Sequence, residues 1–586
     1  MHILKHQTTR RCNMNPMKAI YTEKNNCQDC YKCIRHCPVK AIKIEDHSAS
    51  IVYDLCIYCG KCTTICPVGA KKVRNDVSEA KYLLKGREKV ILSLAPSYVN
   101  EFPEFSQHQL IEAITTLGFY GVSETALGAE LVVEQVKLLR QDNHSAPAIS
   151  SCCPVIVELV RKYYPHLVHY ITPVVSPMEA HARMLKEQYG EDIKVIFAGP
   201  CIAKKTELEQ VNNAVDVALT FPELDSWLKE EGFTPDFFMG KEDNVFIPRQ
   251  AKDAALFPVD GGMISNLKNN AGVADDLFMS FSGIQNVRSI LDDFDNICHE
   301  NIFLELMACE GGCINGPAKI TASSPAHKRF HIISDVHKLQ INNQPAPLPD
   351  KMLLSVPEID NQSVTVFNEK EIREALQTVG KVSAKDELNC GGCGYDSCRE
   401  FAKAMLEGKA ERQMCVSYMR RVAQNKATVL LQKIPYGVVM VDEHMRIIES
   451  NATFAEMLGK EGHDLFTTRP RLEGAMLEKL VPFSKLFDTV LNTGADSIEK
   501  DIRMNEKMLQ ISVFTIQKHK IVCGIIHDMK KSVNQVEMVE KRLRKVMLDN
   551  MATAQKAAFL LGENVSQTET ILNSVMDLFD NENRDE

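Results

Sequence analysis

The sequence predicts a multidomain protein of mixed α/β and α+β class, on three observations. The chain has 586 residues, a length that usually folds as three to five domains. Its 20 cysteines gather in a few short groups. Strand-like and helix-like stretches alternate between residues 89 and 197, which is the pattern of parallel strands joined by helices.

The composition is that of an ordinary globular protein, with 45% hydrophobic and 25% charged residues. There are 68 basic and 77 acidic residues, and the net charge of −9 argues against binding to nucleic acid or to an anionic membrane. No apolar run has transmembrane length, and the start of the chain lacks the apolar stretch of a secretion signal. We therefore expect a cytoplasmic protein, in which closely spaced cysteines are metal ligands or redox groups.

Two cysteine runs of the same spacing lie near the N-terminus. Each has the pattern C-x2-C-x2-C-x3-C-P, within residues 27–38 and 56–67. This spacing binds two [4Fe-4S] clusters in bacterial ferredoxins, where the fourth cysteine of each run binds the other cluster. We expect a two-cluster ferredoxin domain over residues 18–76 that conducts electrons, with two zinc sites as the alternative. The predicted ligand sets are Cys27, Cys30, Cys33 and Cys66 for one cluster, and Cys56, Cys59, Cys62 and Cys37 for the other.

An α/β domain is expected to follow the polar stretch at residues 75–87. Residues 89–94 predict a buried strand that ends in Ala95-Pro96-Ser97, and residues 193–197 predict another strand just before Cys201. In parallel sheets, functional sites gather in the loops at the carboxyl ends of the strands. Both loops are therefore candidate site positions. Helix-like stretches alternate with these strands at residues 110–118, 129–141, 155–164 and 178–189.

Three segments carry further cysteines: SSCCP at residues 150–154, GPCIAKKTE at 199–207 and ELMACEGGC at 305–313. In this order they resemble the three signature segments of the [FeFe]-hydrogenases. The resemblance covers roughly residues 20–350 and implies an α/β H-cluster domain over residues 85–350.

The resemblance implies an H-cluster, which is a [4Fe-4S] cubane bridged to a two-iron unit with CO, cyanide and dithiolate ligands. Cys152 would pass protons to and from the dithiolate; a structural role beside Cys153 is the alternative. Cys313 would also bridge the cubane to the two-iron unit. The cubane ligands implied by the resemblance are Cys153, Cys201, Cys309 and Cys313.

Other positions would shape the pocket of the two-iron unit. By the resemblance, Lys204 would donate a hydrogen bond to one cyanide, and Glu207 would support the site from behind. The backbone of Ala95, Pro96 and Ser97 would contact the other cyanide, and Met307 would pack against the two-iron unit. The alternatives are a solvated helix lysine for Lys204 and an ordinary core residue for Met307.

The chain departs from the usual family pattern around these ligands. Gly199 replaces the methionine of the usual Met-Pro-Cys, which removes one side-chain wall of the pocket, and Ile156 replaces a tryptophan. The glycine-rich tail is shortened to residues 315–317. The helix at residues 130–136 has apolar or amide residues where relay carboxylates are usual. These departures resemble the sensory branch of the family.

A further group, C-x2-C-x4-C-x16-C, follows a Pro-rich linker at residues 344–349. It resembles the small four-cysteine [4Fe-4S] domain of several redox proteins, and we expect such a domain over residues 375–422. A zinc ribbon is the alternative. The predicted ligands are Cys390, Cys393, Cys398 and Cys415.

The remaining chain predicts a signalling module. Residues 427–528 resemble a PAS domain of unknown ligand, with two strands, an Asn-begun helix and further strands at residues 508–516 and 521–527; another small α+β domain is the alternative. Residues 529–580 have apolar positions three and four apart, which predicts a dimeric coiled coil, or else a helix packed on its own domain.

Three functions compete. The first is a sensory [FeFe]-hydrogenase that binds or slowly turns over H2 and passes its redox state to the PAS domain. The second is a metabolic, ferredoxin-dependent hydrogenase. The third is a non-enzymatic iron–sulfur redox sensor without the two-iron unit. The expected partners are H2 and protons, a redox protein such as ferredoxin, and a signalling protein bound by a homodimer.

Overall fold

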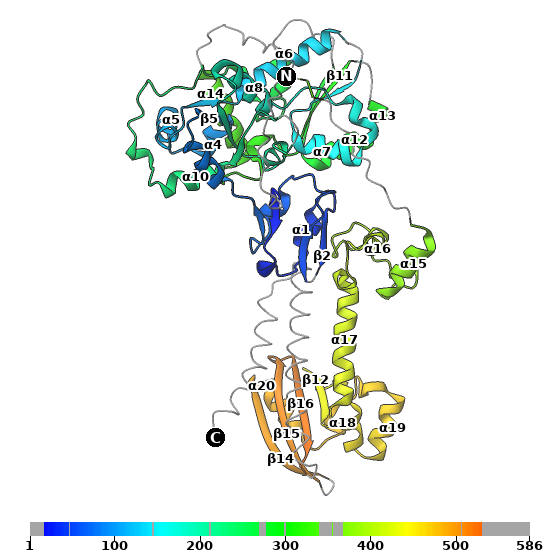
Figure 1. Cartoon of the computed structure of the whole chain (residues 1–586). Coiled ribbons are helices and arrows are strands. Elements are labelled where there is room, and N and C mark those ends of the chain that lie inside the picture. The colour runs from blue at the N-terminus through cyan, green and yellow to red at the C-terminus, as the bar shows by residue number, and fades with distance from the viewer. Residues whose placement is uncertain are drawn as a thin grey trace, which may run out of the picture. The chain divides into compact units, whose positions relative to one another are not determined.

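The computed structural model divides into two units, Met1–Val366 and Phe367–Glu586, which are taken separately below (Figure 1). The predicted linker at residues 344–349 lies outside the described residues, and so does the predicted coiled coil apart from Met529. In the parts described here, no helix is long and apolar enough to cross a membrane. The described residues are 17–45, 47–142, 146–209, 213–268, 277–297, 301–338, 354–355, 367–504 and 507–529.

The first unit begins with a small module built as two similar halves. Strand β1 (Ile20–Thr22) pairs antiparallel with β4 (Lys71–Val73), and β2 (Ile42–Glu45) pairs antiparallel with β3 (Ser48–Ile51). The short helices α1 (Lys32–His36) and α2 (Lys61–Ile65) each contain the third cysteine of a run and end at the fourth. The two cysteine runs therefore have the same local structure.

Helix α3 (Val77–Leu84) occupies the polar stretch that the sequence marks as a boundary. Its Val77 and Ala80 are buried in the core of the α/β region, while the charged residues face away from it. The stretch is thus a helix packed on the α/β region, and Leu83 and Leu84 at its end also pack against this core.

The α/β region contains two parallel sheets. The first has the order β6-β5-β8-β9, and the second has the order β10-β11-β7. Parallel strands were expected, but their division between two sheets was not. Their bounds are β5 (Val90–Leu94), β6 (Gly121–Glu124), β7 (Ala148–Ile149), β8 (Lys194–Gly199), β9 (Val217–Thr220), β10 (Leu277–Ser282) and β11 (Ile302–Met307).

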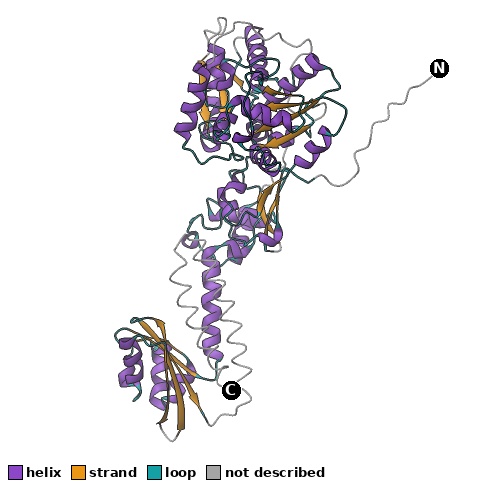
Figure 2. Cartoon of the chain, turned by 90° about the vertical axis from the view of Figure 1, so that its left-hand side faces the viewer, coloured by secondary structure: helices purple, strands orange, loops and turns teal. Residues whose placement is uncertain are grey.

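Helices cover the faces of these sheets, as parallel strands require (Figure 2). All five residues of β5 are buried, which fits a strand covered on both faces. The helices of the region are α4 (Tyr98–Glu101), α5 (Gln107–Thr116), α6 (Ala126–Asp142), α7 (Pro154–Tyr163), α8 (Pro177–Tyr189), α9 (Lys204–Glu207), α10 (Phe221–Glu230), α11 (Gly262–Lys268), α12 (Ile284–Asp292), α13 (Phe294–Ile297) and α14 (Pro325–Lys338).

The second unit starts with a small helical part. Helix α15 (Glu369–Thr378) packs through Ile372 and Leu376 against α16 (Cys398–Leu406), and α17 (Val416–Lys433) follows. This part contains the third cysteine group.

A five-stranded antiparallel sheet completes the second unit, in the order β13-β12-β16-β15-β14. The side chain of Asn451 accepts hydrogen bonds from the N–H groups of Phe454 (2.9 Å) and Val438 (2.9 Å), so it both caps a helix and fixes a strand. The last two strands were expected at these positions. The elements are β12 (Gly437–Asp442), β13 (Ile447–Ser450), α18 (Ala452–Met457), α19 (Lys460–Thr468), α20 (Ser484–Thr493), β14 (Ser497–Met504), β15 (Lys507–Gln517) and β16 (Ile521–Asp528).

Candidate functional site

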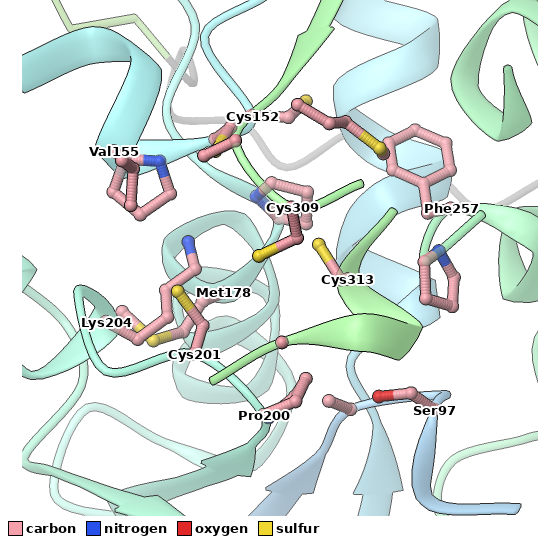
Figure 3. A pocket seen from close by; sticks show the side chains of 18 of the residues that line it. Ser97, Cys152, Val155, Met178, Pro200, Cys201, Lys204, Phe257, Cys309 and Cys313 are labelled. Atoms are coloured by element: carbon pink, nitrogen blue, oxygen red, sulfur yellow. The ribbon is translucent and has the colours of Figure 1, made fainter. Parts of the chain in front are cut away.

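One cavity of the first unit collects residues from all the segments that the sequence singles out (Figure 3). Cys309 and Cys313 point into it from one side, and Cys201 and Lys204 face them. Glu207 does not line the cavity but lies behind Lys204. The predicted residues that line it are Ala95, Pro96, Ser97, Cys152, Cys153, Cys201, Lys204, Met307, Cys309 and Cys313.

The fold explains how distant segments meet. Four parallel strands end beside the cavity: β5 leads to Ala95, β7 to Cys152, β8 to Cys201 and β11 to Cys309. Two of these strands belong to each sheet, so the cavity lies between the carboxyl ends of both. The loops that follow the strands at residues 89–94 and 193–197 both reach the cavity, because in each sheet the loops at the carboxyl ends of the strands gather at one edge.

The turn between Cys309 and Cys313 depends on its two glycines. Gly311 and Gly312 have φ values of 73° and 103°, which residues with a side chain rarely adopt. A Cβ on Gly312 would also lie 2.3 Å from the carbonyl oxygen of Pro258. The glycines therefore let the chain fold tightly enough to aim both thiols into one cavity.

Phe197 fills the wall that the sequence leaves open at Gly199. A Cβ on Gly199 would meet the Phe197 ring at 2.5 Å, and this ring lines the cavity. The expectation of a missing wall is therefore wrong. An aromatic residue two positions earlier on β8 points to the same side because side chains alternate along a strand.

Lys204 is held by an ion pair at the edge of the cavity. Its Nζ lies 2.6 Å from Glu207 Oε2, which also accepts a hydrogen bond from Ser176 Oγ at 3.3 Å. Burial lowers the pKa of Lys204, but Glu207 and the nearby thiols more than offset this, and its pKa ends above the ordinary value. The ammonium group therefore stays charged beside the thiols, and Glu207 holds it there.

The thiols of the cavity are buried, so their pKa values are raised. Burial raises the pKa of Cys201 to about 11 and also raises the pKa of Cys153 and Cys313 above the ordinary value. Iron ligation requires thiolates, so loading of the site releases protons and supplies the compensating positive charge.

The Cys152 side chain and backbone contact a thioether and a hydroxyl group. Its Sγ lies 3.7 Å from Met263 Sδ, and its N–H donates to Ser150 Oγ at 3.3 Å. Burial, assisted by the nearby Glu305 carboxyl, raises the pKa of Cys152 to about 12. The thiol is therefore a proton holder at neutral pH. Sequence reasoning singled out neither Met263 nor Glu305 for this role, because no motif marks them as neighbours of Cys152.

The glutamates of α6 are engaged elsewhere. Glu130 forms an ion pair with Arg249, and Glu134 forms one with Lys137. Glu305 is the buried carboxyl that lines the cavity; it accepts the N–H groups of Met263 (3.3 Å) and Ile264 (3.1 Å). Burial raises its pKa to about 7.

Ser97 Oγ offers a direct test of whether a polar group fits the cavity. It is buried and has no hydrogen-bond partner within the described parts of the chain. Since a buried hydroxyl without a partner is costly, its position at the cavity wall fits a ligand that accepts a hydrogen bond. Together with the four thiols and Lys204, this residue set fits the iron–sulfur group that the sequence predicts. No three His, Cys, Asp or Glu side chains in the described ranges converge as ligands of a single metal ion.

The N-terminal cysteines adjoin this site. Cys59 lines both the main cavity and a smaller one that it shares with Cys37, Cys56 and Cys62, which is one of the predicted ligand sets. The other set also gathers, since Cys27, Cys30 and Cys66 all act on the pKa of Cys33. Sequence reasoning did not anticipate that Cys59 would lie beside Cys309.

The third cysteine group forms its own cavity in the second unit. Cys390, Cys393, Cys398 and Cys415 line it together, so the predicted set is brought to one place. None of the 18 cysteines that the structure describes forms a disulfide.

Comparison with known families decides the identity of the main site. Residues 88–317 match the family described as "Iron only hydrogenase large subunit, C-terminal domain". Residues 88–317 belong to the [FeFe]-hydrogenase family. Residues 19–80 of this hydrogenase-like protein match a "4Fe-4S dicluster domain", and residues 386–417 match a family described as "Putative Fe-S cluster". The protein is thus a hydrogenase-like iron–sulfur protein.

Several relatives of this chain are distant in sequence. Iron hydrogenase 1 of Clostridium pasteurianum is 24% identical over 42% of this chain and 52% of its own length, so the chain spans about half of that relative. The periplasmic [Fe] hydrogenase large subunit of Nitratidesulfovibrio vulgaris is 25% identical over 53% of this chain and 88% of its own length. The solved [FeFe]-hydrogenase HydA1 from Chlamydomonas reinhardtii is 18% identical, with a TM-score of 0.37 over 49% of this chain and 99% of that one.

Proposed function

We propose that this protein is a sensory [FeFe]-hydrogenase that binds or slowly turns over H2 and passes its redox state to the second unit. The observation that supports it most is the single cavity in which the four thiols, Cys152, Lys204 and Met307 meet. The two-iron unit, when bound, would supply the centre at which H2 is formed or split. Cys153, Cys201, Cys309 and Cys313 would hold the adjoining cubane.

The chain's own residues would manage protons and charge. Cys152 holds a proton at neutral pH, since burial keeps its pKa far above that range. Lys204, charged and anchored by Glu207, would donate toward an anionic ligand of the two-iron unit, and Ser97 Oγ is free to do the same from the opposite loop. Phe197 and Met307 line the cavity with apolar side chains, which would keep water from the centre.

The surroundings of Cys152 support slow turnover and hence sensing. A thioether accepts hydrogen bonds weakly and does not carry a proton at neutral pH, yet Met263 Sδ is the group next to the Cys152 thiol. The carboxylates of α6 are held in ion pairs with Arg249 and Lys137. A fast proton path through these groups is therefore unfavourable.

The second unit would receive the signal. Its four-cysteine site would relay electrons, and its antiparallel sheet with an Asn-capped helix supports the proposal of a PAS domain, with a signalling partner bound by a homodimer. A ferredoxin-like protein would exchange electrons with the dicluster domain. A metabolic, ferredoxin-dependent hydrogenase is the competing function with the same cofactors.

A non-enzymatic role is the second alternative with a specific observation behind it. The cytosolic Fe-S cluster assembly factor NAR1 of Meyerozyma guilliermondii is 28% identical over 24% of this chain. The deciding difference is the two-iron unit. Lys204, Ser97 and Cys152 line a cavity beyond the cubane thiols, which favours a protein that holds that unit.

Infrared spectroscopy tests the proposal. Anaerobic protein supplied with the two-iron unit is expected to show CO and cyanide bands, and their absence would exclude both hydrogenase functions. H2 turnover then separates these two, because a rate equal to that of metabolic hydrogenases would contradict the sensory role.

The variant Cys152→Ala tests the proton role. It should keep the CO and cyanide bands while H2 evolution falls by at least tenfold, because general acid–base groups contribute about 10²–10⁴ in rate. Ser151→Ala, one residue earlier, is the matched control and should keep most of the activity. Unchanged evolution in Cys152→Ala would show that protons take another route.

A further inference from the structure

Most buried lysines among the described residues are paired with a carboxylate. Seven of the described lysines are buried, and five of them have an acidic partner within ion-pair distance. This is the expected pattern, because an unpaired charge away from water is costly. The pairs are Lys137–Glu134, Lys162–Glu158, Lys204–Glu207, Lys205 with Asp76 and Glu223, and Lys328–Glu101.

Lys71 and Lys381 are the two exceptions among the described lysines. They are 4% and 5% exposed, and neither forms an ion pair with any described carboxylate. Lys71 Nζ donates to Thr22 Oγ1 and to the carbonyl of Ala49, each at 2.6 Å. Lys381 Nζ donates to the carbonyl of Asp386 at 2.7 Å. Neutral oxygens orient these two ammonium groups but do not neutralise them.

Lys71 lies among the ligands of the dicluster domain. The residue before it, Ala70, donates its N–H to Cys66 Sγ at 3.2 Å. Ala49, whose carbonyl Lys71 holds, donates its own N–H to Cys27 Sγ at 3.4 Å. Burial raises the pKa of Cys33 to about 12, and the charge of Lys71 acts against this rise. The charge of Lys71 also acts to lower the pKa of Cys56 and Cys62, so one cation acts on thiols of both ligand sets of the dicluster domain.

The duplication within the module shows that this lysine is not a packing requirement. Five residues after the last cysteine, the second run has Lys71 where the first run has Ile42, which is 2% exposed. The preceding residues make equivalent contacts, since Ala41 N–H donates to Cys37 Sγ at 3.3 Å. The same backbone thus accepts an apolar side chain at this position.

Lys381 has the corresponding place in the second unit. It lines the cavity formed by Cys390, Cys393, Cys398 and Cys415. Lys71 and Lys381 therefore both lie beside a set of cysteines, although the cysteine spacings of the two sets differ.

We propose that Lys71 and Lys381 are internal counter-ions of the iron–sulfur clusters beside them and raise the reduction potentials of those clusters. The inference rests on the proposed [4Fe-4S] ligand sets. A four-thiolate cluster carries net negative charge that grows on reduction, so a buried cation stabilises the reduced form more than the oxidised form. The negative charge of each cluster would thus take the place of the carboxylate that pairs with the other buried lysines.

Redox titration of the reconstituted full chain, followed by electron paramagnetic resonance, tests this. Lys71→Gln keeps a hydrogen-bond donor but removes the charge, and it should lower the midpoint potential of N-terminal cluster signals. We expect about a tenfold fall in the ratio of reduced to oxidised cluster at fixed potential, which is about 59 mV for a one-electron couple. Lys381→Gln should shift a different signal by a similar amount and leave the first unchanged.

Exposed neighbours provide matched controls. Lys72, whose side chain is 44% exposed, and the exposed Lys385 lose the same charge in Lys72→Gln and Lys385→Gln. Solvent screens these charges, so both variants should titrate as the wild type does. Equal shifts in the exposed and buried variants, or no shift in either buried variant, would overturn the counter-ion role.

Failure of the clusters to assemble is also informative. If Lys71→Gln fails to assemble its clusters, Lys71→Arg and Lys71→Ile replace it; Arg should keep the wild-type potential, and Ile, the residue of the first run, should lower it. Equal potentials for both would overturn the inference. A wild-type chain that assembles no N-terminal clusters would instead overturn the proposed cofactor set and the inference with it.

Discussion

His181 is a single residue that connects two strands of the sheet behind the cavity. It is fully buried on α8, and its ring nitrogens lie 2.7 Å from Ser93 Oγ and 2.8 Å from Ser123 Oγ. Burial lowers the pKa of His181 to about 3, so the folded protein holds a neutral imidazole. The ring thereby joins β5, whose end lies beside the cavity, to its neighbour β6.

The stability of the protein should therefore depend on pH through His181. In the unfolded chain a histidine titrates near pH 6.5, so its contribution is complete above that pH and is lost as the pH falls toward 3. Between pH 7.5 and 5.5 this group alone should remove about 1.4 kcal/mol from the free energy of unfolding. Denaturant titrations of His181→Gln should show a free energy of unfolding that falls less between pH 7.5 and 5.5 than that of the wild type.

His444→Gln is the control, because its side chain is 72% exposed. It should keep the pH dependence of the wild type. A loss in His181→Gln as large as that of the wild type would mean that another group causes the dependence.

Residue identities were the most predictable part of the site. Cysteines at fixed spacing and the three signature segments pointed to the thiols that line the cavity, because the cysteines that bind iron–sulfur clusters recur at fixed spacings. Phe197, Met263 and Glu305 were not predictable in the same way. Their roles arise from packing between strands and helices that are distant in sequence, and no local pattern marks such contacts.

At the scale of elements, the turn after β11 is constrained in two ways. A side chain at Gly312 would meet both an unfavourable φ of 103° and the backbone of Pro258. Gly190 has nearly the same φ, 106°, but nothing lies within 4 Å of its Cβ position. A comparison of the two glycines therefore distinguishes the effect of an unfavourable φ from the effect of a steric clash.

Gly312→Ala should abolish assembly of the cubane at Cys309 and Cys313, because the turn must open to relieve the collision. Gly190→Ala should cost about 1–2 kcal/mol of stability and keep the cluster, since only the backbone preference is lost. Iron content and the visible absorption of the reconstituted chain report the difference. Normal iron content in Gly312→Ala would show that the turn is more tolerant than its geometry indicates.

The elements with long apolar runs were predicted to within a few residues, as for β5, β8 and α8. The second sheet was missed for physical reasons. β7 has two residues, too few for a pattern, and no residue of β10 is fully buried, so it lacks the continuous apolar run of a central strand. The order of the cysteine groups along the chain is given by the sequence itself. That Cys59 and Cys309 line the same cavity could not be predicted from it.

At the scale of the whole molecule, the hydrogenase-like site and the antiparallel sheet belong to separate units. A chain that ends at Val366 should therefore keep the infrared bands of the two-iron unit and lose the iron of one cluster only. Iron analysis and infrared spectra of the shortened and full chains make the comparison. Loss of the bands would mean that the second unit is needed to complete the site.

Helix α7 gives the first unit a further property. It begins directly after Cys153, and near its other end Lys162 Nζ donates to the carbonyl of Cys56 at 2.9 Å and Tyr163 Oη to that of Leu55 at 2.7 Å. One rigid helix thus spans the distance between two proposed clusters. With the proposed clusters bound, the rate of electron entry into the site would depend on driving force and not on solvent viscosity, because no part of the chain would have to move.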